Sequence, residues 1–335
     1  MRADAVKQKT GFGRIIGKVL LYFFTFLLVI LIGLVGAVAM IDLGPSPAVR
    51  DLFVVTVTQT SAGGFLASMF LDEATIAEII EKNSVAGSDE ITDGDNVVIG
   101  GGDENYDLDK IEVFDVTGPT YKGKMMVVND PSRVFVGSIP DYTVERGNTV
   151  QEIVAMYDGV AGVNGGGFED IAGRGKGATP LGLVISQGEW LNGYAGQGYY
   201  HVVGFNQEDK LVVGYMTGAR AKELGLRDAV AFGPALIING EPVEVTGSGG
   251  GLNPRTALGQ RADGAVLILV IDGRQPNSLG ASFLDIIEIM QEYGAVNCGN
   301  LDGGTSSNMV YNNEVITNCC SLYGPRDLPT AIVVK

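Results

Sequence analysis

The sequence predicts a mixed α/β (α+β) protein, in which a mixed β-sheet with flanking helices follows one N-terminal transmembrane helix. Three observations predict this class. Residues 19–41 form a run of 23 residues without a charge. From about residue 110 onward, short runs rich in β-branched and aromatic residues are separated by glycines, as strands are. Three segments with the periodicity of an amphipathic helix lie between these runs.

Residues 19–41 are predicted to be a transmembrane signal anchor. A helix of this length spans about 34 Å, which is enough to cross the hydrocarbon core of a bilayer. Residues 1–18 contain five basic residues and one acidic residue, so this tail is expected in the cytoplasm and residues 42–335 outside it. The alternative is a cleaved signal peptide, because Ala37-Val38-Ala39 resembles a cleavage site. The apolar run is, however, longer than the usual signal core of about 7–15 residues.

Composition argues against several functional classes. A hydrophobic fraction of 46% excludes a disordered chain, and a net charge of −16 argues against nucleic acid as a partner. Three cysteines are too few for a disulfide scaffold, although Cys298 could pair with Cys319 or Cys320. A single histidine, His201, with no CxxC and no GxSxG motif, argues against a zinc site and against serine–histidine catalysis.

Residues 42–109 are expected to form a juxtamembrane helical region followed by an acidic linker. Four residues of the linker have the alternate spacing of a calcium-binding loop: Asp103, Asn105, Asp107 and Asp109. A calcium loop requires glycine and glutamate where this chain has Leu108 and Phe114. A solvated linker is therefore preferred to a calcium site.

Residues 110–335 are predicted to form one domain. Eight runs are predicted as strands: 111–116, 124–128, 133–138, 183–186, 201–205, 211–215, 235–238 and 266–271. Three segments are predicted as helices: 149–157, 219–226 and 282–293. Four polar, glycine-rich loops between these elements are candidates for chemistry: 163–170, 173–178, 247–259 and 300–307.

The first two loops differ in what they can bind. In the first, consecutive glycines that include Gly165 and Gly166 allow a backbone to approach a ligand closely, and Asn164, Glu169 and Asp170 supply polar atoms. A plain β-turn is the alternative. The second loop matches G-x-G-x-x-A formally, but it precedes a strand instead of opening a helix after one. This context argues against a dinucleotide site.

The other two loops carry a cation and a carboxylate. Arg255, followed by Thr256, has the planar fork that holds a phosphate with two hydrogen bonds, and Arg274 is a second candidate for that role. A surface arginine is the alternative. The fourth loop has a carboxylate, two glycines and then hydroxyls: Asp302, Gly303, Gly304, Thr305 and Ser306. Its N–H groups and hydroxyls can bind phosphate oxygens while the carboxylate acts as base, nucleophile or hydroxyl acceptor. An Asp-Gly hairpin turn would look similar.

Six motifs occur in order along the chain: VNGGGFED (163–170), PLGLVI (180–185), FGPALIINGE (232–241), NPRTALGQR (253–261), LVIDGRQ (269–275) and NLDGGTSS (300–307). This series resembles the phosphodiester glycosidase family over roughly residues 110–335. An animal member of that family removes N-acetylglucosamine from a phosphodiester during lysosomal sorting, and bacterial relatives include exopolysaccharide biosynthesis factors. Thr305 and Gly167 depart from the residues expected at their positions.

The resemblance implies a membrane-anchored extracytoplasmic glycosidase that hydrolyses sugar-1-phosphodiester bonds in a cell-surface glycan or a related phosphosugar. The residue inventory agrees, because a glycosidase commonly uses two carboxylates. A phosphate leaving group is stable as an anion, so a guanidinium can supply much of the stabilisation. No cofactor is expected, and a divalent cation held by Asp302 and Asp272 stays open.

Site roles are assigned on this basis as hypotheses. The phosphate is assigned to Arg255, helped by Thr256 or Arg274. Asp302 and Glu169 are the leading candidates for the catalytic carboxylates, with Asp170 in reserve, and sugar hydroxyls or phosphate oxygens are assigned to Asn164, Thr305 and Ser306. Two other classes remain: a non-catalytic module that binds an anionic glycan during exopolysaccharide or cell-wall assembly, and a structural protein whose polar loops are only turns.

Overall fold

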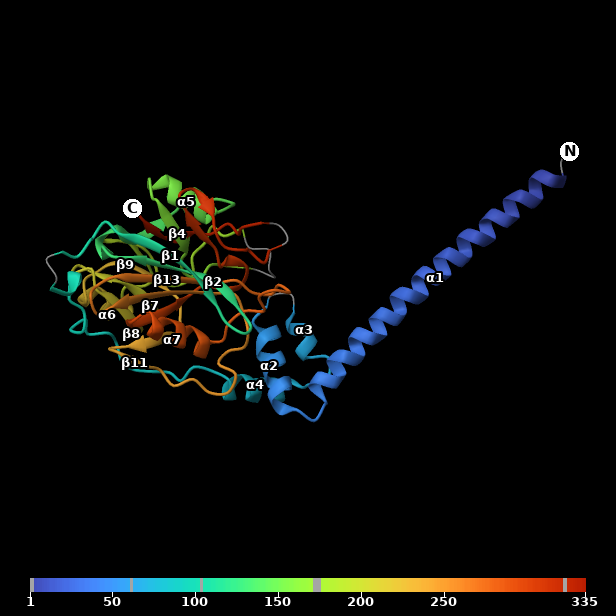
Figure 1. Ribbon diagram of the computed structural model, residues 1–335, viewed down its shortest axis with the longest axis horizontal. Helices are drawn as coiled ribbons and strands as arrows, with labels where there is room; N and C mark the ends of the chain where they lie inside the picture. The colour runs from blue at the N-terminus through green and yellow to red at the C-terminus, as the bar shows by residue number, and fades with distance from the viewer. Residues whose placement is uncertain (1–2, 61–62, 103–104, 171–175, 322–323) are drawn as a thin grey trace.

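One long helix projects away from the rest of the molecule in the computed structural model (Figure 1). The structure describes residues 3–60, 63–102, 105–170, 176–321 and 324–335. The helix is α1 (Ala3–Asp42), and its predicted anchor segment, residues 19–41, is continuous and largely exposed. By length and composition Gly13–Asp42 could cross a membrane, a criterion that a signal sequence also meets.

Three short helices lie between α1 and the β-structure (Figure 1): α2 (Pro47–Thr58), α3 (Gly64–Ala67) and α4 (Glu73–Lys82). Ser46 caps α2 by accepting the N–H of Val49, and Asp72 caps α4 by accepting the N–H of Thr75 at 2.7 Å. These caps satisfy N–H groups that have no partner in the first turn of a helix. The helices bury a small apolar cluster of their own: Val54, Val55, Ala67 and Ile79. A single turn, η1 (Ile99–Gly102), follows α4.

The strands form three sheets in which all neighbouring strands pair antiparallel. Sheet I has the order β1 (Ile111–Thr117), β2 (Lys122–Val128), β13 (Val266–Ile271), β12 (Arg255–Arg261), β14 (Ala295–Leu301), β10 (Ala235–Ile238) and β11 (Glu241–Pro242). Sheet II has the order β16 (Glu314–Val315), β15 (Met309–Tyr311), β4 (Ala161–Asn164), β17 (Thr330–Val334) and β3 (Val134–Ser138). Sheet III has the order β6 (Glu189–Asn192), β5 (Val184–Ser186), β9 (Leu226–Ala231), β7 (Tyr199–Asn206) and β8 (Leu211–Thr217).

The hydrophobic core lies between the three sheets. Met126 of sheet I, Val163 of sheet II and Val203 of sheet III belong to one buried cluster. The other face of sheet I is covered by α7 (Phe283–Glu292), whose Ile286 and Met290 are fully buried. A strand that is buried on both faces needs no polar alternation, which explains the uninterrupted apolar run of β13. The remaining helices, α5 (Val150–Met156) and α6 (Gly218–Glu223), pack against sheets II and III, and two single turns are η2 (Pro131–Arg133) and η4 (Gly304–Ser306).

The α+β class, the predicted strands and the three predicted helices are confirmed, with differences at their ends. The strands are divided among three antiparallel sheets, however, where one mixed sheet was expected. Several central strands were not predicted: β12 and β14 of sheet I, β4 and β17 of sheet II, and β9 of sheet III. The segment 247–259 was expected to be a loop, but its last residues belong to β12. This strand was not predicted because Arg255, Thr256 and Gln260 are polar residues that the fold buries inside a sheet.

The suggested disulfide is wrong, because all three cysteines are free. Cys298 lies on β14 and is fully buried in the cluster between sheet I and α7. This burial raises the pKa of the Cys298 thiol. Cys319 and Cys320 instead contact the carbonyls of Thr305 and Gly304, at 3.6 Å each.

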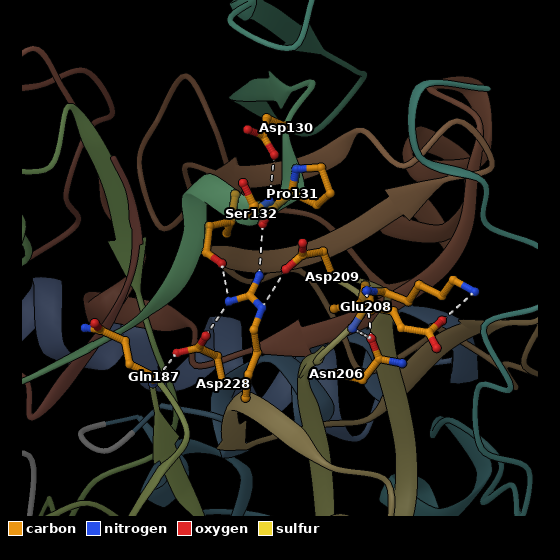
Figure 2. A network of polar contacts seen from close by, with 12 residues as sticks. Asp130, Pro131, Ser132, Gln187, Asn206, Glu208, Asp209 and Asp228 are labelled. Atoms are coloured by element: carbon orange, nitrogen blue, oxygen red, sulfur yellow. Dashed lines mark hydrogen bonds and ion pairs between the residues drawn. The ribbon is translucent and has the colours of Figure 1, made fainter. Parts of the chain in front are cut away.

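A buried ion pair joins sheet III to sheet II. Asp209, Asp228 and Pro131, labelled in Figure 2, all contact the guanidinium of Arg227 on β9. Arg227 also donates to the carbonyl of Val134 on β3 at 3.0 Å. Asp228, which is 1% exposed, accepts the N–H groups of Val136 and Gln187 at 2.9 Å each. Each partner of the ion pair therefore also bonds to the main chain of the neighbouring elements.

We expect Asp228→Ala to lower the free energy of unfolding by about 3–5 kcal/mol, because it removes one of the two carboxylates paired with Arg227 and leaves two N–H groups without their acceptor. The measurement is urea unfolding of the purified protein. Asp115→Ala is the control, since Asp115 is 78% exposed in its ion pair with Lys124, and it should cost at most about 1 kcal/mol. Equal losses in the two variants would contradict a structural role for the Arg227 network.

Candidate active site

The ends of strands from sheets I and II meet at the candidate site. Asn164 is the last residue of β4, and its side chain is fully buried. Its Oδ1 accepts the hydroxyl of Thr256, at the start of β12, at 2.8 Å, and its Nδ2 donates to the carbonyl of Asp302, just after β14, at 2.5 Å. Because Asn164 and Thr256 are both 0% exposed, they position the main chain of Asp302 and do not face solvent.

The glycines after Asn164 are required by a close approach of two strands. The N–H groups of Gly165 and Gly166 donate to the carbonyl and the hydroxyl of Thr330, at 3.1 and 3.2 Å. A Cβ on Gly165 would lie 2.5 Å from the Thr330 hydroxyl. The carbonyl of Gly165 in turn accepts the N–H of Asp302 at 3.2 Å. The first loop therefore holds the Asp302 backbone, where the sequence suggested a direct approach to a ligand.

The carboxyl of Asp302 has an unusual acidity. Burial raises the pKa of Asp302 to about 6, even though hydrogen bonds from Ser306 and from the N–H of Gly303, and the charge of Arg326, favour the ionised form. The negative charge of Asp170 raises the pKa further. Raised pKa values of this kind, with a specific set of charge partners, are typical of functional carboxylates.

Arg326 was not identified from the sequence. Its guanidinium pairs with Asp170 at 3.1 Å, contacts the hydroxyl of Thr305 at 3.3 Å and lies 5.2 Å from the centre of the Phe168 ring. It thus joins the first loop to the fourth. Arg326 lies after the last of the six motifs. The sequence feature that could have pointed to it is an arginine next to a glycine and a proline, shortly before the last strand.

Arg274 also lies close to the fourth loop. A Cβ built on Gly304, which has a φ of +64°, would be 3.2 Å from a guanidinium nitrogen of Arg274. The same guanidinium donates to Asn253 Oδ1 at 2.9 Å and to the carbonyl of Gln59 at 3.3 Å. Two cations, Arg274 and Arg326, therefore flank the segment that follows Asp302.

Arg255 is placed differently from its neighbour Thr256, because successive side chains of a strand point to opposite faces. It is 6% exposed and lies against α7, with its guanidinium 4.0 Å from the centre of the Phe283 ring. It donates to the carbonyls of Gly250, Gly251 and Ala281 at 2.8, 3.2 and 3.2 Å. Burial lowers the pKa of Arg255. These contacts hold the loop before β12.

The remaining candidates are more dispersed. Glu169 is exposed, and its N–H donates to the carbonyl of Thr179. Asp272 is buried, and both of its oxygens accept from Asn318, at 2.9 and 2.8 Å. Parts of the second loop (173–175) and Asp103 of the linker lie outside the described residues. Within the described ranges, no group of three or more metal-ligating side chains is assembled.

Because the pKa of Asp302 is raised in the folded protein, its ionised form opposes folding. Below about pH 4 the carboxyl is protonated in both states, and the cost grows as pH rises to about 6. A shift from 3.8 to about 6 corresponds to about 3 kcal/mol. Asp302→Asn should therefore be more stable than the wild type at about pH 7, with the difference shrinking toward about pH 4. Urea unfolding at both pH values measures this, and a variant less stable at neutral pH would contradict it.

A comparison with one solved structure agrees with this fold. The catalytic domain of zebrafish N-acetylglucosamine-1-phosphodiester alpha-N-acetylglucosaminidase, auto-inhibited by its pro-peptide, has a TM-score of 0.57 and 20% identity, covering 73% of this chain and 87% of that one. A hypothetical protein from Synechocystis has a TM-score of 0.48 and 16% identity over 67% and 62% of the two chains.

In sequence, the SPbeta prophage-derived uncharacterized protein YomE of Bacillus subtilis (strain 168) is 35% identical over 99 residues, which is 28% of this chain. The match spans 15% of that relative's length. A family model described as phosphodiester glycosidase matches residues 157–335, more than half of the chain. The predicted family is confirmed, and this protein belongs to the phosphodiester glycosidase family.

Proposed function

We propose that this protein is a membrane-anchored extracytoplasmic glycosidase that hydrolyses sugar-1-phosphodiester bonds of a cell-surface glycan or a related phosphosugar. The observation that carries the proposal is the Asp302 carboxyl, whose pKa is raised to about 6 beside a loop flanked by two guanidinium groups. The carboxylate can act at the anomeric carbon of such a substrate, and the two guanidinium groups can bind its negatively charged phosphate.

Arg326 and Arg274, with the hydroxyl of Thr305, are the groups that would bind the phosphate. Both arginines lie beside the loop after Asp302, and a guanidinium can bind two phosphate oxygens at once. The first hypothesis gave this role to Arg255. Its contacts with three carbonyls and with Phe283 support a positioning role for Arg255 instead.

Asp302 would act in its ionised form, which predominates at pH 7 for a pKa of about 6. Hydrolysis breaks the bond between the anomeric carbon and the phosphate oxygen, and the electron pair leaves with the phosphate. Water adds to the anomeric carbon, and Asp302 accepts its proton or forms the first bond to that carbon as a nucleophile. Asp170 is the second carboxylate in contact with this network, through Arg326, while Glu169 remains an exposed alternative.

The helix α1 and its flanks support the proposed location. The basic residues before α1's apolar stretch favour a cytoplasmic N-terminus, which would leave residues 42–335 outside the cytoplasm. A membrane-anchored domain there would encounter exopolysaccharide or cell-wall glycans. The competing function is a non-catalytic module for an anionic glycan, because the same arginines would bind one without cleaving it.

A turnover assay separates these two functions. We expect the full-length protein to release free sugar from members of a panel of sugar-1-phosphodiesters, and Asp302→Asn to lower kcat by about 10²–10⁴-fold while it still binds a non-hydrolysable phosphonate analogue. Asp115→Asn, a surface change, serves as the control. Binding of the analogue without turnover by the wild type would establish the binding module in place of the enzyme.

The two arginine roles predict different losses. Arg326→Gln should raise KM for a phosphodiester by about 10–100-fold, because charged hydrogen bonds contribute about 1.5–3 kcal/mol, and it should leave a folded protein. Arg255→Gln should instead lower the free energy of unfolding by about 3 kcal/mol, because three buried carbonyls lose their donor. Steady-state kinetics and urea unfolding of both variants test this. A raised KM with unchanged stability in Arg255→Gln would show that Arg255, and not Arg326, binds the phosphate.

A further inference from the structure

A cavity of about 560 Å³ lies between the N-terminal helices and the β-structure. One wall comes from α2, α4 and the segment after α4, and includes Val55, Ile80 and Val85. The opposite wall includes His201 of β7, Tyr215 of β8 and Phe232, which follows β9. The volume suits one or two sugar rings or another small ligand group.

Among the residues that the structure describes, the cavity wall carries no acidic or basic side chain other than His201, in a protein with 39 acidic and 23 basic residues. Burial lowers the pKa of His201, which keeps the imidazole neutral at pH 7. Gln59, Asn83 and Ser88, which carry amide and hydroxyl groups, are also among the residues that line the cavity. An uncharged ligand with hydroxyl groups matches this wall better than a phosphate or a carboxylate does.

Aromatic rings form a row along sheet III at this cavity. His201 and Tyr215 are directly opposite each other on β7 and β8, with ring centres 4.7 Å apart. Tyr199 continues the row, stacked on Tyr215 at 5.1 Å and 27°. Tyr199 and Tyr215 are 61% and 42% exposed. Exposed aromatic side chains gathered in this way mark a contact surface, and the C–H face of a pyranose ring packs on aromatic rings.

Two residues of the cavity wall are bonded to residues of the candidate active site. Gly233 lines the cavity, and its carbonyl accepts the side chain of Asn300, two residues before Asp302, at 2.8 Å. Gln59 also lines the cavity, and its carbonyl accepts Arg274 at 3.3 Å. The cavity and Arg274 are therefore separated by one residue, Gln59, which puts the cavity beside the candidate phosphate site.

We propose that this cavity is a subsite for an uncharged saccharide unit of the substrate, stacked on Tyr215 and His201. That the saccharide belongs to the substrate rests on the proposed function. One wall of the subsite comes from residues 55–88, which precede the matched family region of 157–335. The N-terminal helices would thus take part in selecting the substrate as well as connecting the domain to α1.

The test uses the full-length protein in phosphatidylcholine nanodiscs, which carry no sugar headgroup. Isothermal titration calorimetry measures binding of three neutral probes, cellohexaose, maltohexaose and chitohexaose, and of hexagalacturonate as an anionic probe. We expect one neutral probe to bind with a millimolar or lower Kd and hexagalacturonate to bind at least tenfold more weakly. Tyr215→Ala should weaken binding on the order of tenfold, which corresponds to about 1.4 kcal/mol.

Matched variants separate loss of the ring from loss of the fold. Tyr215→Phe keeps the ring and should retain binding, whereas His201→Ala, the second change within the row, should weaken it. Tyr194→Ala removes a 67% exposed tyrosine that does not line the cavity and should change nothing. Circular dichroism confirms that each variant is folded. Absence of binding by all neutral probes, equal binding of hexagalacturonate, or no effect of either row variant would overturn the subsite.

The design distinguishes this inference from the proposed function. Asp302→Asn should bind the neutral probe as the wild type does, because Asp302 does not line the cavity. Saccharide binding by a wild type that cleaves no phosphodiester would support the subsite and reject the enzyme. Cleavage of phosphodiesters by a protein that binds no neutral probe would support the enzyme and overturn the subsite.

Discussion

The buried side chain of Asn164 is the interaction on which the candidate site depends. It ends a strand of sheet II and bonds to Thr256, the second residue of β12, and to the segment after β14, both of sheet I. A buried amide is costly unless its groups are paired, so this pair of bonds specifies how the two sheets meet. Asp302 takes its position from that meeting, because its carbonyl and its N–H are both held by residues of the first loop.

The electrostatics of the site follow from this placement. The Asp302 carboxyl is shielded from water by the surrounding protein, and this burial raises its pKa. Two hydrogen bonds and the charge of Arg326 favour the ionised form but do not cancel the rise. The fold thus maintains a carboxylate in a position that is unfavourable for stability. Sites of chemistry commonly carry such a cost, which is offset elsewhere in the structure. Here the large core between three sheets and the Arg227 network supply stabilisation at a distance from Asp302.

The N-terminal helices are part of the same arrangement. Thr56 and Gln59, at the end of α2, bond to the loop that contains Leu252 and Asn253, and Gln59 also accepts Arg274. The region that connects α1 to the β-structure therefore contacts a cation of the candidate site and closes one side of the neutral cavity. Any movement of α2 relative to sheet I would change both features together.

The sequence by itself determined the α+β class, the apolar N-terminal helix, about half of the strands and the amphipathic helix α7, because each depends on local composition or periodicity. It also identified Asp302 and the loop after it through a pattern of neighbouring residues. Tertiary structure decided the rest. Polar strands such as β12 are recognised only by their partners, and the opposite directions of Arg255 and Thr256 depend on which faces those partners cover. The contact of Arg326 with Asp170 and the cavity beside His201 join residues far apart in the chain, and no local pattern records which distant segments will pack together.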